Sequence, residues 1–316
     1  MRVAVLEPQL PLRVDDEAEL AERLCEALHE HGYDVELIRI PFREELGERV
    51  PEQMLALRLI NLDNVDRAIA LRFPAYLLPH SDRVVWLSQR AKASTGAPGA
   101  SVRAAERSYL AEAARVHAAS ALAARELALD TGLSASVLYP PLRDPRAYRC
   151  ERYGERLLLS AEDGVTPSVA VALAALSRAP SAGLTLACPA VSAPALSALA
   201  SELGVSERVE LVEQAEERPF ALLASARALV CVERDCELLA REAFRSSKAV
   251  IALADCGGAG ELVRDRDNGR VAATAEELSQ AFEELSQDRA LAERYGSAGA
   301  QEPQASWETV VAELTR

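Results

Sequence analysis

Acidic and glycine residues gather in one stretch of the second half of the chain, directly after two short apolar runs. Carboxylates can accept hydrogen bonds from a ligand, and glycines allow a ligand to approach the backbone closely. A tight strand-to-helix turn would need the same glycines without any ligand. The candidate residues are Glu233, Asp235, Glu242, Gly257, Gly258 and Glu261.

The strands that must position these residues follow from the hydrophobic pattern. Short apolar runs alternate with amphipathic helical stretches, which predicts parallel sheets built from βαβ units. In the first half, the expected strands are Arg2–Leu6, Asp34–Ile40, Arg67–Leu71, Val84–Leu87, Val116–Ala119 and Ser136–Tyr139. In the second half, they are Leu157–Ser160, Leu184–Cys188, Val209–Val212, Ala228–Val232, Ala249–Leu253 and Val271–Ala273.

Helical periodicity fills the gaps between these strands. Leu20, Leu24 and Leu28 recur at helical spacing before Gly32, which predicts an amphipathic helix on the surface of a sheet. Further helices are expected over residues 170–176, 195–203, 220–226, 275–285, 289–296 and 306–314.

Two doubly wound domains are expected, with a boundary near the middle of the chain. The phrase Tyr139-Pro140-Pro141 interrupts the alternation, and the polar segment 143–153 that follows predicts the interdomain linker. With 316 residues, the chain is long enough for two domains that each bury a core. Open α/β sheets bind ligands beyond the carboxyl ends of their strands, so a cleft there is the expected site.

The composition argues against several classes of function. The 35 basic and 49 acidic residues give a formal net charge of −14, which disfavours nucleic acid and anionic lipid as partners. The six cysteines form no C-x-x-C pair, so neither a metal site nor a disulfide framework is expected. No apolar run approaches the roughly 20 residues of a membrane span, and Met1 leads directly into a strand rather than a signal peptide. We therefore expect a cytoplasmic protein without a metal.

Four phrases along the chain resemble family 4 glycosyltransferases, which transfer a sugar from a nucleotide donor. Residues 72–90 read RFPAYLLPHSDRVVWLSQR, where a subgroup of the family has K-F-P-A-Y-L-x-x-H-P-x-K-V-V-W-L-L-H-Q-H-R. Residues 138–142 read LYPPL, as at the domain junction of the family, and residues 230–263 resemble its donor half. Ser306-Trp307 resembles the beginning of its terminal helix. Four phrases in the family order indicate fold and ancestry rather than activity.

This resemblance implies an α/β protein of the GT-B class, with two doubly wound Rossmann-like domains facing across a cleft. An acceptor-side domain is expected over residues 1–145 and a nucleotide-sugar-side domain over residues 146–303. The terminal helix, within residues 304–316, is expected to return to the N-terminal domain.

Two positions of the first domain depart from the family pattern. The loop after the first strand lacks the glycines that let donor phosphates approach, and it carries Asp15 and Asp16, which we interpret as caps of the next helix. An ungapped match places Gln89 where the family has a histidine near the transferred sugar. Glutamine can form hydrogen bonds but cannot exchange protons near neutral pH. His80 is interpreted as a loop residue rather than a replacement.

The basic clamp of the family is missing from the second domain. After the expected strand Leu157–Ser160, Glu162 and Asp163 stand where the family has an arginine and a lysine that hold the donor diphosphate. A carboxylate about 4 Å from a phosphate charge costs on the order of 4 kcal/mol at an effective dielectric constant near 20. The sequence therefore predicts weak binding of nucleotide sugars.

The pair of acids that the family places eight residues apart is only half retained. Glu242 matches the second acid, which holds the donor ribose, but Arg234 replaces the first acid, which faces the sugar. A one-residue shift of the loop would present Glu233 or Asp235 instead, and Glu242 could equally be a carboxylate on a helix surface. The residues that match the loops beyond are Asp255, Gly257, Gly258, Glu261, Asn268 and Gly269.

Four altered elements around one site favour a pseudo-glycosyltransferase. In this interpretation Gln89 and Arg234 are degenerate positions, no residue is catalytic and no cofactor is bound. The protein then acts on a protein partner, either an active glycosyltransferase or another copy of itself.

Two alternatives remain open from the sequence. The first is an active, metal-independent retaining hexosyltransferase, in which Glu233, Asp235 and Glu242 contact a nucleotide sugar; the clamp is then replaced by Arg13, Arg72 or Arg90. The second is a module that binds a sugar or a lipid headgroup through three aromatic residues that are also expected in the core, namely Phe73, Tyr76 and Trp86.

Overall fold

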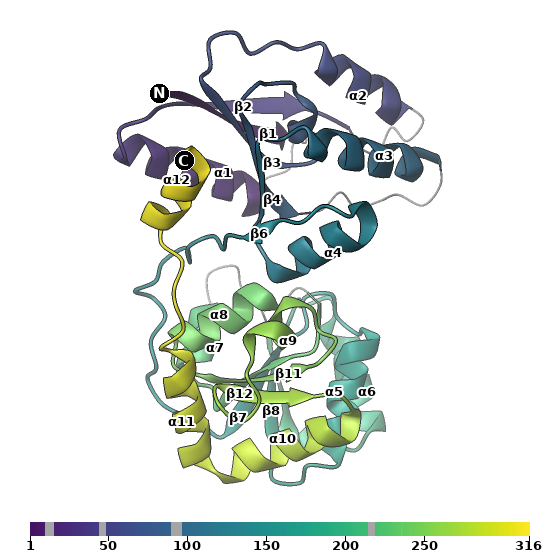
Figure 1. Cartoon of the computed structure of the whole chain (residues 1–316). Coiled ribbons are helices and arrows are strands. Elements are labelled where there is room, and N and C mark those ends of the chain that lie inside the picture. The colour runs from purple at the N-terminus through teal and green to yellow at the C-terminus, as the bar shows by residue number, and fades with distance from the viewer. Residues whose placement is uncertain (10–15, 44–48, 90–96, 214–218, 235) are drawn as a thin grey trace. The chain divides into compact units, whose positions relative to one another are not determined.

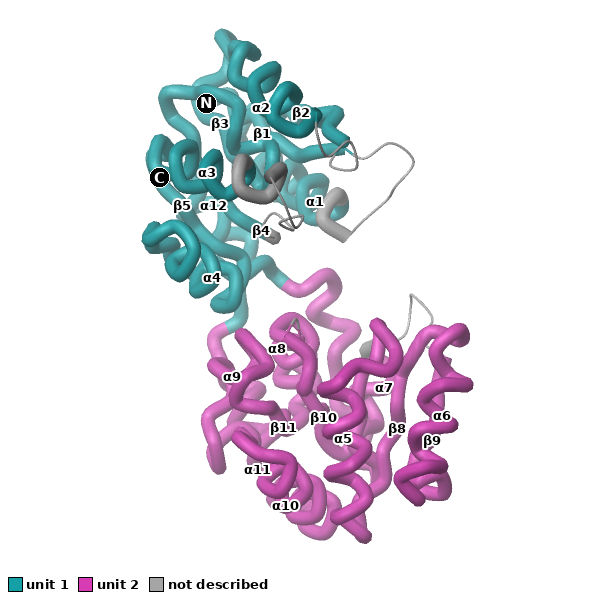
Figure 2. The backbone as a smooth tube through the Cα atoms, turned by 90° about the vertical axis from the view of Figure 1, so that its right-hand side faces the viewer, with its two compact units in different colours: residues 1–141, 304–316 teal, residues 142–303 magenta. Residues whose placement is uncertain are grey.

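The computed structural model describes residues 1–9, 16–43, 49–89, 97–213, 219–234 and 236–316. The chain divides into two compact units, drawn in different colours in Figure 2. Unit 1 comprises Met1–Pro141 and Gln304–Arg316, and unit 2 comprises Leu142–Pro303. The polar segment 143–153 belongs to unit 2, and the expected boundary after residue 145 lies a few residues beyond Pro141.

Unit 1 is built on a six-stranded parallel sheet with the strand order β2-β1-β3-β4-β5-β6 (Figure 1). Its strands are β1 Arg2–Gln9, β2 Asp34–Pro41, β3 Arg67–Arg72, β4 Arg83–Gln89, β5 Arg115–Ala118 and β6 Ser136–Val137. Its helices are α1 Asp16–Glu30, α2 Val50–Arg58, α3 Ala97–Ala111, α4 Ala121–Thr131 and α12 Trp307–Thr315.

Unit 2 has a second six-stranded parallel sheet with the order β12-β11-β10-β7-β8-β9. Its strands are β7 Arg156–Ser160, β8 Gly183–Cys188, β9 Val209–Glu213, β10 Ala228–Cys231, β11 Ala249–Leu253 and β12 Gly269–Ala272. Its helices are α5 Pro167–Ser177, α6 Ala193–Glu202, α7 Pro219–Ser225, α8 Glu237–Arg245, α9 Gly258–Leu262, α10 Ala275–Gln287 and α11 Arg289–Gly299.

Both faces of each sheet are covered, which explains the continuous apolar runs of the central strands. In β10, for example, all four residues are buried. One face of the unit 2 sheet packs around Leu159, Leu173 and Phe282, and the other around Leu158 and Phe244. Every expected strand is present, so the prediction of an α/β protein with two doubly wound units is confirmed.

Helix α12 completes the core of unit 1, although its residues are far from the rest of that unit in the sequence. Figure 1 shows it beside α1. Val310, Val311 and Leu314 are buried in the cluster that also contains Trp86. The rings of Trp86 and Trp307 form an edge-to-face pair with centroids 6.2 Å apart. Burial of this apolar face is the main force that holds the helix on the unit.

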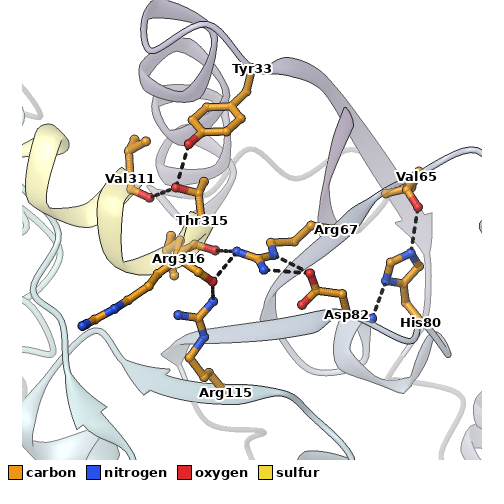
Figure 3. Close-up of polar contacts among 10 residues, drawn as sticks. Tyr33, Val65, Arg67, His80, Asp82, Arg115, Val311, Thr315 and Arg316 are labelled. Atoms are coloured by element: carbon orange, nitrogen blue, oxygen red, sulfur yellow. Dashed lines mark hydrogen bonds and ion pairs between the residues drawn. The ribbon is translucent and has the colours of Figure 1, made fainter. Parts of the chain in front are cut away.

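Polar contacts fix the end of α12 on the same unit (Figure 3). Arg67 donates hydrogen bonds to the backbone oxygens of Leu314 at 3.2 Å and Arg316 at 2.9 Å, and it also pairs with Asp82 at 2.7 Å. The hydroxyl of Tyr33 donates to Oγ1 of Thr315 at 2.9 Å. The two backbone bonds from Arg67 satisfy carbonyl groups that the end of a helix leaves without a partner within the helix. Within the described residues, no helix is long and apolar enough to cross a bilayer.

Candidate functional site

The candidate site lies at the carboxyl edge of the unit 2 sheet, where β7 and β10 pair with each other. From this point the chain builds β8 and β9 on one side, and β11 and β12 on the other. Open α/β sheets bind ligands beyond the carboxyl ends of strands at such a switch point. The loops after β7, β10 and β11 carry the candidate residues of the sequence analysis.

A hydrogen bond joins the loops that follow β7 and β10. Thr166 caps α5, because its Oγ1 accepts a hydrogen bond from the backbone N–H of Val169 at 3.1 Å. The same hydroxyl donates to Oε1 of Glu233. A carboxylate is stabilised near a helix N-terminus, which is also where a phosphate would bind. The carboxylate of Glu233 therefore lies at the beginning of α5, next to the capping hydroxyl of Thr166.

Glu242 is a half-buried residue of α8. Its Oε1 accepts a 2.6 Å hydrogen bond from the hydroxyl of Tyr148. Burial raises the pKa of Glu242, and the negative charge of Glu162 acts in the same direction; the bond from Tyr148 and the charge of Arg241 oppose them. The carboxylate that the family resemblance assigns to the donor ribose is thus already held by a side chain of the same unit.

Glu237, the first residue of α8, is only 5 % exposed although it is acidic. Its carboxyl group packs directly on Gly258, the first residue of α9. A Cβ atom added to Gly258 would collide with Cγ, Cδ and Oε2 of Glu237. A larger residue at position 258 would therefore require the Glu237 side chain to move.

The remaining candidates lie between β11 and β12, and they either have structural roles or are exposed. Gly257 precedes α9 with a φ of 70°, a conformation that favours glycine. Asp255 and Glu261 are exposed. Asn268 is buried, and its Oδ1 accepts a 2.7 Å hydrogen bond from the backbone N–H of Arg264, which orders the turn before β12.

The two positions expected to be degenerate, Arg234 and Gln89, lie in different units. Arg234 is exposed after β10, and Glu162 and Asp163 are exposed after β7. Acidic groups therefore stand on both loops of the switch point, as the sequence indicates. Gln89 ends β4 in unit 1, where its backbone pairs with that of Arg72. Asp235 lies outside the described residues.

In unit 1, an ion pair joins β1 and β3, the two neighbouring strands at the switch point of that sheet. Nη2 of Arg72 lies 2.5 Å from Oε1 of Glu7, and both side chains are largely buried. Breaking such a buried pair leaves an uncompensated charge. The structure therefore does not support a phosphate-clamping role for Arg72, because its charge is engaged by Glu7. The other proposed replacements, Arg13 and Arg90, lie outside the described residues, as does Asp15.

His80 and the three aromatic candidates are structural. Nε2 of His80 lies 3.0 Å from the carbonyl oxygen of Val65, and its Nδ1 accepts a hydrogen bond from the backbone N–H of Asp82 at 3.1 Å (Figure 3). The side chains of Phe73, Tyr76 and Trp86 are buried in the two cores of unit 1. The alternative of a sugar- or lipid-binding surface made by these rings is therefore wrong. In the described part of the chain, no cluster of His, Cys, Asp and Glu is arranged to hold a metal ion.

Three residues of the site were not found from the sequence. Tyr148 lies in the polar segment that was interpreted as a linker, and Glu237 stands among several other acids after β10. Thr166 carries a recognisable signal, because a threonine followed by proline is a typical helix start. Contacts between distant loops bring all three to the site, and no local pattern reports such contacts.

Comparison with known proteins agrees with this architecture. Residues 158–288 match the family model of glycosyl transferases group 1. No curated protein sequence matches the chain. Anabaena Alr3699/HepE, solved in complex with UDP, is similar in structure with a TM-score of 0.68 and 15% identity, covering 100% of this chain and 98% of that one.

Two further solved structures are similar over their whole length. WaaG, a glycosyltransferase involved in lipopolysaccharide biosynthesis, has a TM-score of 0.62 and 15% identity, with 100% of both chains covered. AviGT4, a glycosyltransferase involved in avilamycin A biosynthesis, has a TM-score of 0.57 and 20% identity, covering 99% of this chain and 96% of the other. The chain therefore has the GT-B fold of glycosyltransferases, and the part of it that matches the group 1 family model contains the candidate site apart from Tyr148.

Proposed function

We propose that this protein is a pseudo-glycosyltransferase: it keeps the GT-B fold, binds nucleotide sugars weakly or not at all, and acts on a protein partner. The partner that we propose is an active glycosyltransferase. The observation that carries the proposal is the buried carboxyl group of Glu237, which packs on Gly258 in the loop where the family resemblance places the donor.

The charges of the site support the same conclusion. Glu162, Glu233 and Glu237 stand around the switch point, while Glu242 is engaged by Tyr148. A nucleoside diphosphate is itself an anion. A carboxylate about 4 Å from a phosphate charge costs on the order of 4 kcal/mol at an effective dielectric constant near 20. One ribose contact is worth less than two such repulsions.

Exposed aliphatic side chains on the same edge support a role in protein binding. Val165, Val191 and Leu238 are 46%, 86% and 51% exposed. They follow the neighbouring strands β7, β8 and β10, and the loops of Val165 and Val191 touch, since a Cβ atom on Gly164 would meet the Ser192 hydroxyl. Exposed apolar residues on this edge fit a protein surface better than a sugar diphosphate.

Nucleotide binding to the purified chain tests the first half of the proposal. Isothermal titration and thermal shift with UDP, GDP, TDP and ADP, each with and without a sugar, are expected to detect no binding. UDP comes first, because Anabaena Alr3699/HepE was solved with it. A ligand that binds only the folded state must stabilise it. Stabilisation of the wild type by several degrees with any one nucleotide contradicts the proposal.

Two variants separate the bulk of Glu237 from its charge. Glu237→Gly frees the space in front of Gly258 and is expected to gain measurable nucleotide affinity. The matched control Glu237→Gln removes the negative charge but keeps the side chain in place, so it should gain much less. Equal gains in both variants would mean that charge alone closes the site.

Co-expression tests the second half of the proposal. The chain is produced with glycosyltransferases encoded near its gene, and we expect one of them to co-elute with it and to change in activity. Val191→Asp and Leu238→Asp should weaken the complex, while the charge-only change Glu261→Gln on the same edge should not. Elution as a lone monomer, with no effect on the activity of those enzymes, would argue against a partner role.

The rival proposal is an active retaining glycosyltransferase. It is favoured by the match of residues 158–288 to the group 1 family model. In that case Glu233, Asp235 or Glu242 contacts a nucleotide sugar, and the wild type releases free nucleotide from it in the presence of an acceptor. The binding experiments above distinguish the two, because only the rival requires a wild-type nucleotide complex.

A further inference from the structure

A cysteine and a lysine lie side by side at the amino edge of the unit 2 sheet, on the opposite side of the sheet from the candidate site. Nζ of Lys248, the residue before β11, is 3.1 Å from Sγ of Cys150. Cys150 is exposed, whereas Lys248 is 0% exposed. The sulfur is therefore open to small reagents from solvent, while the amine meets only the sulfur and the protein interior.

The amine is held firmly in this position. It donates a 2.6 Å hydrogen bond to the carbonyl oxygen of Arg152 and lies 4.3 Å from the centre of the Tyr153 ring. The Tyr153 hydroxyl is anchored in turn on the backbone oxygen of Ser247 at 2.5 Å. A reacting group that is fixed near its target reacts much faster than one that must find it by diffusion.

The choice of lysine here is distinctive in this sequence. Of the 35 basic residues, only Lys92 and Lys248 are lysines. Arginine is the usual residue for a buried cation, because its guanidinium makes more hydrogen bonds and stays protonated. A lysine provides an amine that can lose its proton and act as a nucleophile.

We propose that Cys150 and Lys248 form a reversible oxidative cross-link, a sulfenamide, when the protein meets hydrogen peroxide. The bond joins Sγ to Nζ directly. It ties the segment that enters unit 2 to the beginning of β11.

The chemistry proceeds in two balanced steps. The Cys150 sulfur attacks the O–O bond of the peroxide; an S–O bond forms, the thiol is oxidised to a sulfenic acid, and the peroxide is reduced to water. The unprotonated Lys248 amine then attacks that sulfur; an S–N bond forms, the S–O bond breaks, and the departing hydroxide takes the amine proton as water. One thiol, one amine and one peroxide thus give one sulfenamide and two waters.

The electrostatic environment supports the second step. Burial lowers the pKa of Lys248, and the positive charges of Arg227 and Arg289 act in the same direction, while the bond to Cys150 opposes them. The fraction of unprotonated amine is therefore larger than for a lysine in water. A thiol can reduce the product, as it reduces other oxidised forms of cysteine, because the S–N bond is open to attack at sulfur.

Proteolysis at lysine tests the proposal on the full chain. A lysine-specific protease can cut only after Lys92 and Lys248, and a modified Lys248 is not cut. After brief treatment with hydrogen peroxide, we expect loss of the cut at Lys248, retention of the cut at Lys92, and recovery of both with dithiothreitol. Mass spectrometry should find Cys150 and Lys248 joined, with two hydrogen atoms fewer than the reduced pair.

Matched variants identify the two atoms. Cys150→Ser changes an exposed side chain, so it should fold normally and keep the cut at Lys248 after peroxide. Lys248→Arg keeps the charge without a comparable nucleophile; its Cys150 should continue to sulfinic acid. The proposal is overturned if treated wild type is still cut at Lys248, if Cys150 is recovered as sulfinic acid or as a disulfide, or if Cys150→Ser also loses the cut.

Discussion

The hydroxyl of Tyr148 donates a 2.6 Å hydrogen bond to Glu242, and thereby joins the segment that enters unit 2 to helix α8. Both groups are affected by the contact. Burial and the Glu242 charge raise the pKa of Tyr148, so its hydroxyl remains a donor at all physiological pH values. A ligand that used the bonded oxygen of Glu242 would have to displace an internal hydrogen bond first.

The titration of Glu242 predicts a pH-dependent contribution to stability. Burial raises the pKa of Glu242 in the folded state, so folding favours its protonated form. The stabilisation is complete below the unfolded pKa of about 4.3 and is lost as the pH rises through the folded pKa. Glu242→Gln, which cannot ionise, should therefore raise the melting temperature more at pH 7 than at pH 4. An equal effect at both pH values contradicts this prediction.

Removing the donor of this bond should have the opposite effect at neutral pH. Tyr148→Phe leaves a half-buried carboxylate without its partner, and hydrogen bonds to charged groups contribute about 1.5–3 kcal/mol. We expect a loss in that range in denaturant unfolding of Tyr148→Phe at pH 7. In the Glu242→Gln background the same change should cost less, because a neutral amide replaces the carboxylate.

The contact between Glu237 and Gly258 predicts strong coupling between two substitutions. Gly258→Ala adds a methyl group where Glu237 already lies, and overpacking of this kind costs about 1–3 kcal/mol. Glu237→Gly should rescue it, since the three atoms nearest to the added methyl group all belong to that side chain. A double-mutant cycle measured by chemical denaturation checks this, and additive effects would show that the two residues do not share the space.

The cap of α5 predicts a difference between two conservative changes. Thr166→Ala removes the bond to the Val169 N–H and should cost about 0.5–2 kcal/mol. Thr166→Ser keeps the hydroxyl, so its stability should remain close to that of the wild type. Melting temperatures of the two variants, compared in one buffer, test the assignment.

The packing of α12 predicts that unit 1 depends on residues from the end of the sequence shown. Leu314→Ala should destabilise unit 1 by about 2–5 kcal/mol, because Leu314 is fully buried. The exposed control Glu308→Gln should change it by less than about 0.5 kcal/mol. Both tryptophans, Trp86 and Trp307, lie in unit 1, so tryptophan fluorescence follows the unfolding of that unit alone.

The sequence predicts the strands well because each has one short apolar run between turn residues. Thus Ala249–Leu253 has the same ends in the sequence analysis and in the structure. The expected strand Ser136–Tyr139 shortens to Ser136–Val137, where the chain pairs with the edge of the sheet and then meets two prolines. Helices α2, α3 and α4 were not singled out, because alanine-rich stretches such as α4 give a weak periodic signal.

The sequence predicts which loops carry the candidate residues, but it does not predict the contacts that those residues make. Glu242 lies on α8 at the expected edge, yet its partner Tyr148 is almost a hundred positions away and no local pattern links them. The glycines at 257 and 258 were expected to serve a turn or a ligand. The structure adds a reason of a different kind for Gly258, namely the side chain of Glu237.

The return of α12 to unit 1 has a consequence for how the chain is made. Unit 2 is a single continuous insertion, Leu142–Pro303, so all its residues are synthesised before Gln304 is added. Unit 1 is split by that insertion, and its core lacks Val310, Val311 and Leu314 until α12 has been synthesised. The unit that is begun first is therefore completed only after the other, and until then the apolar residues that pack on α12 are prone to aggregation.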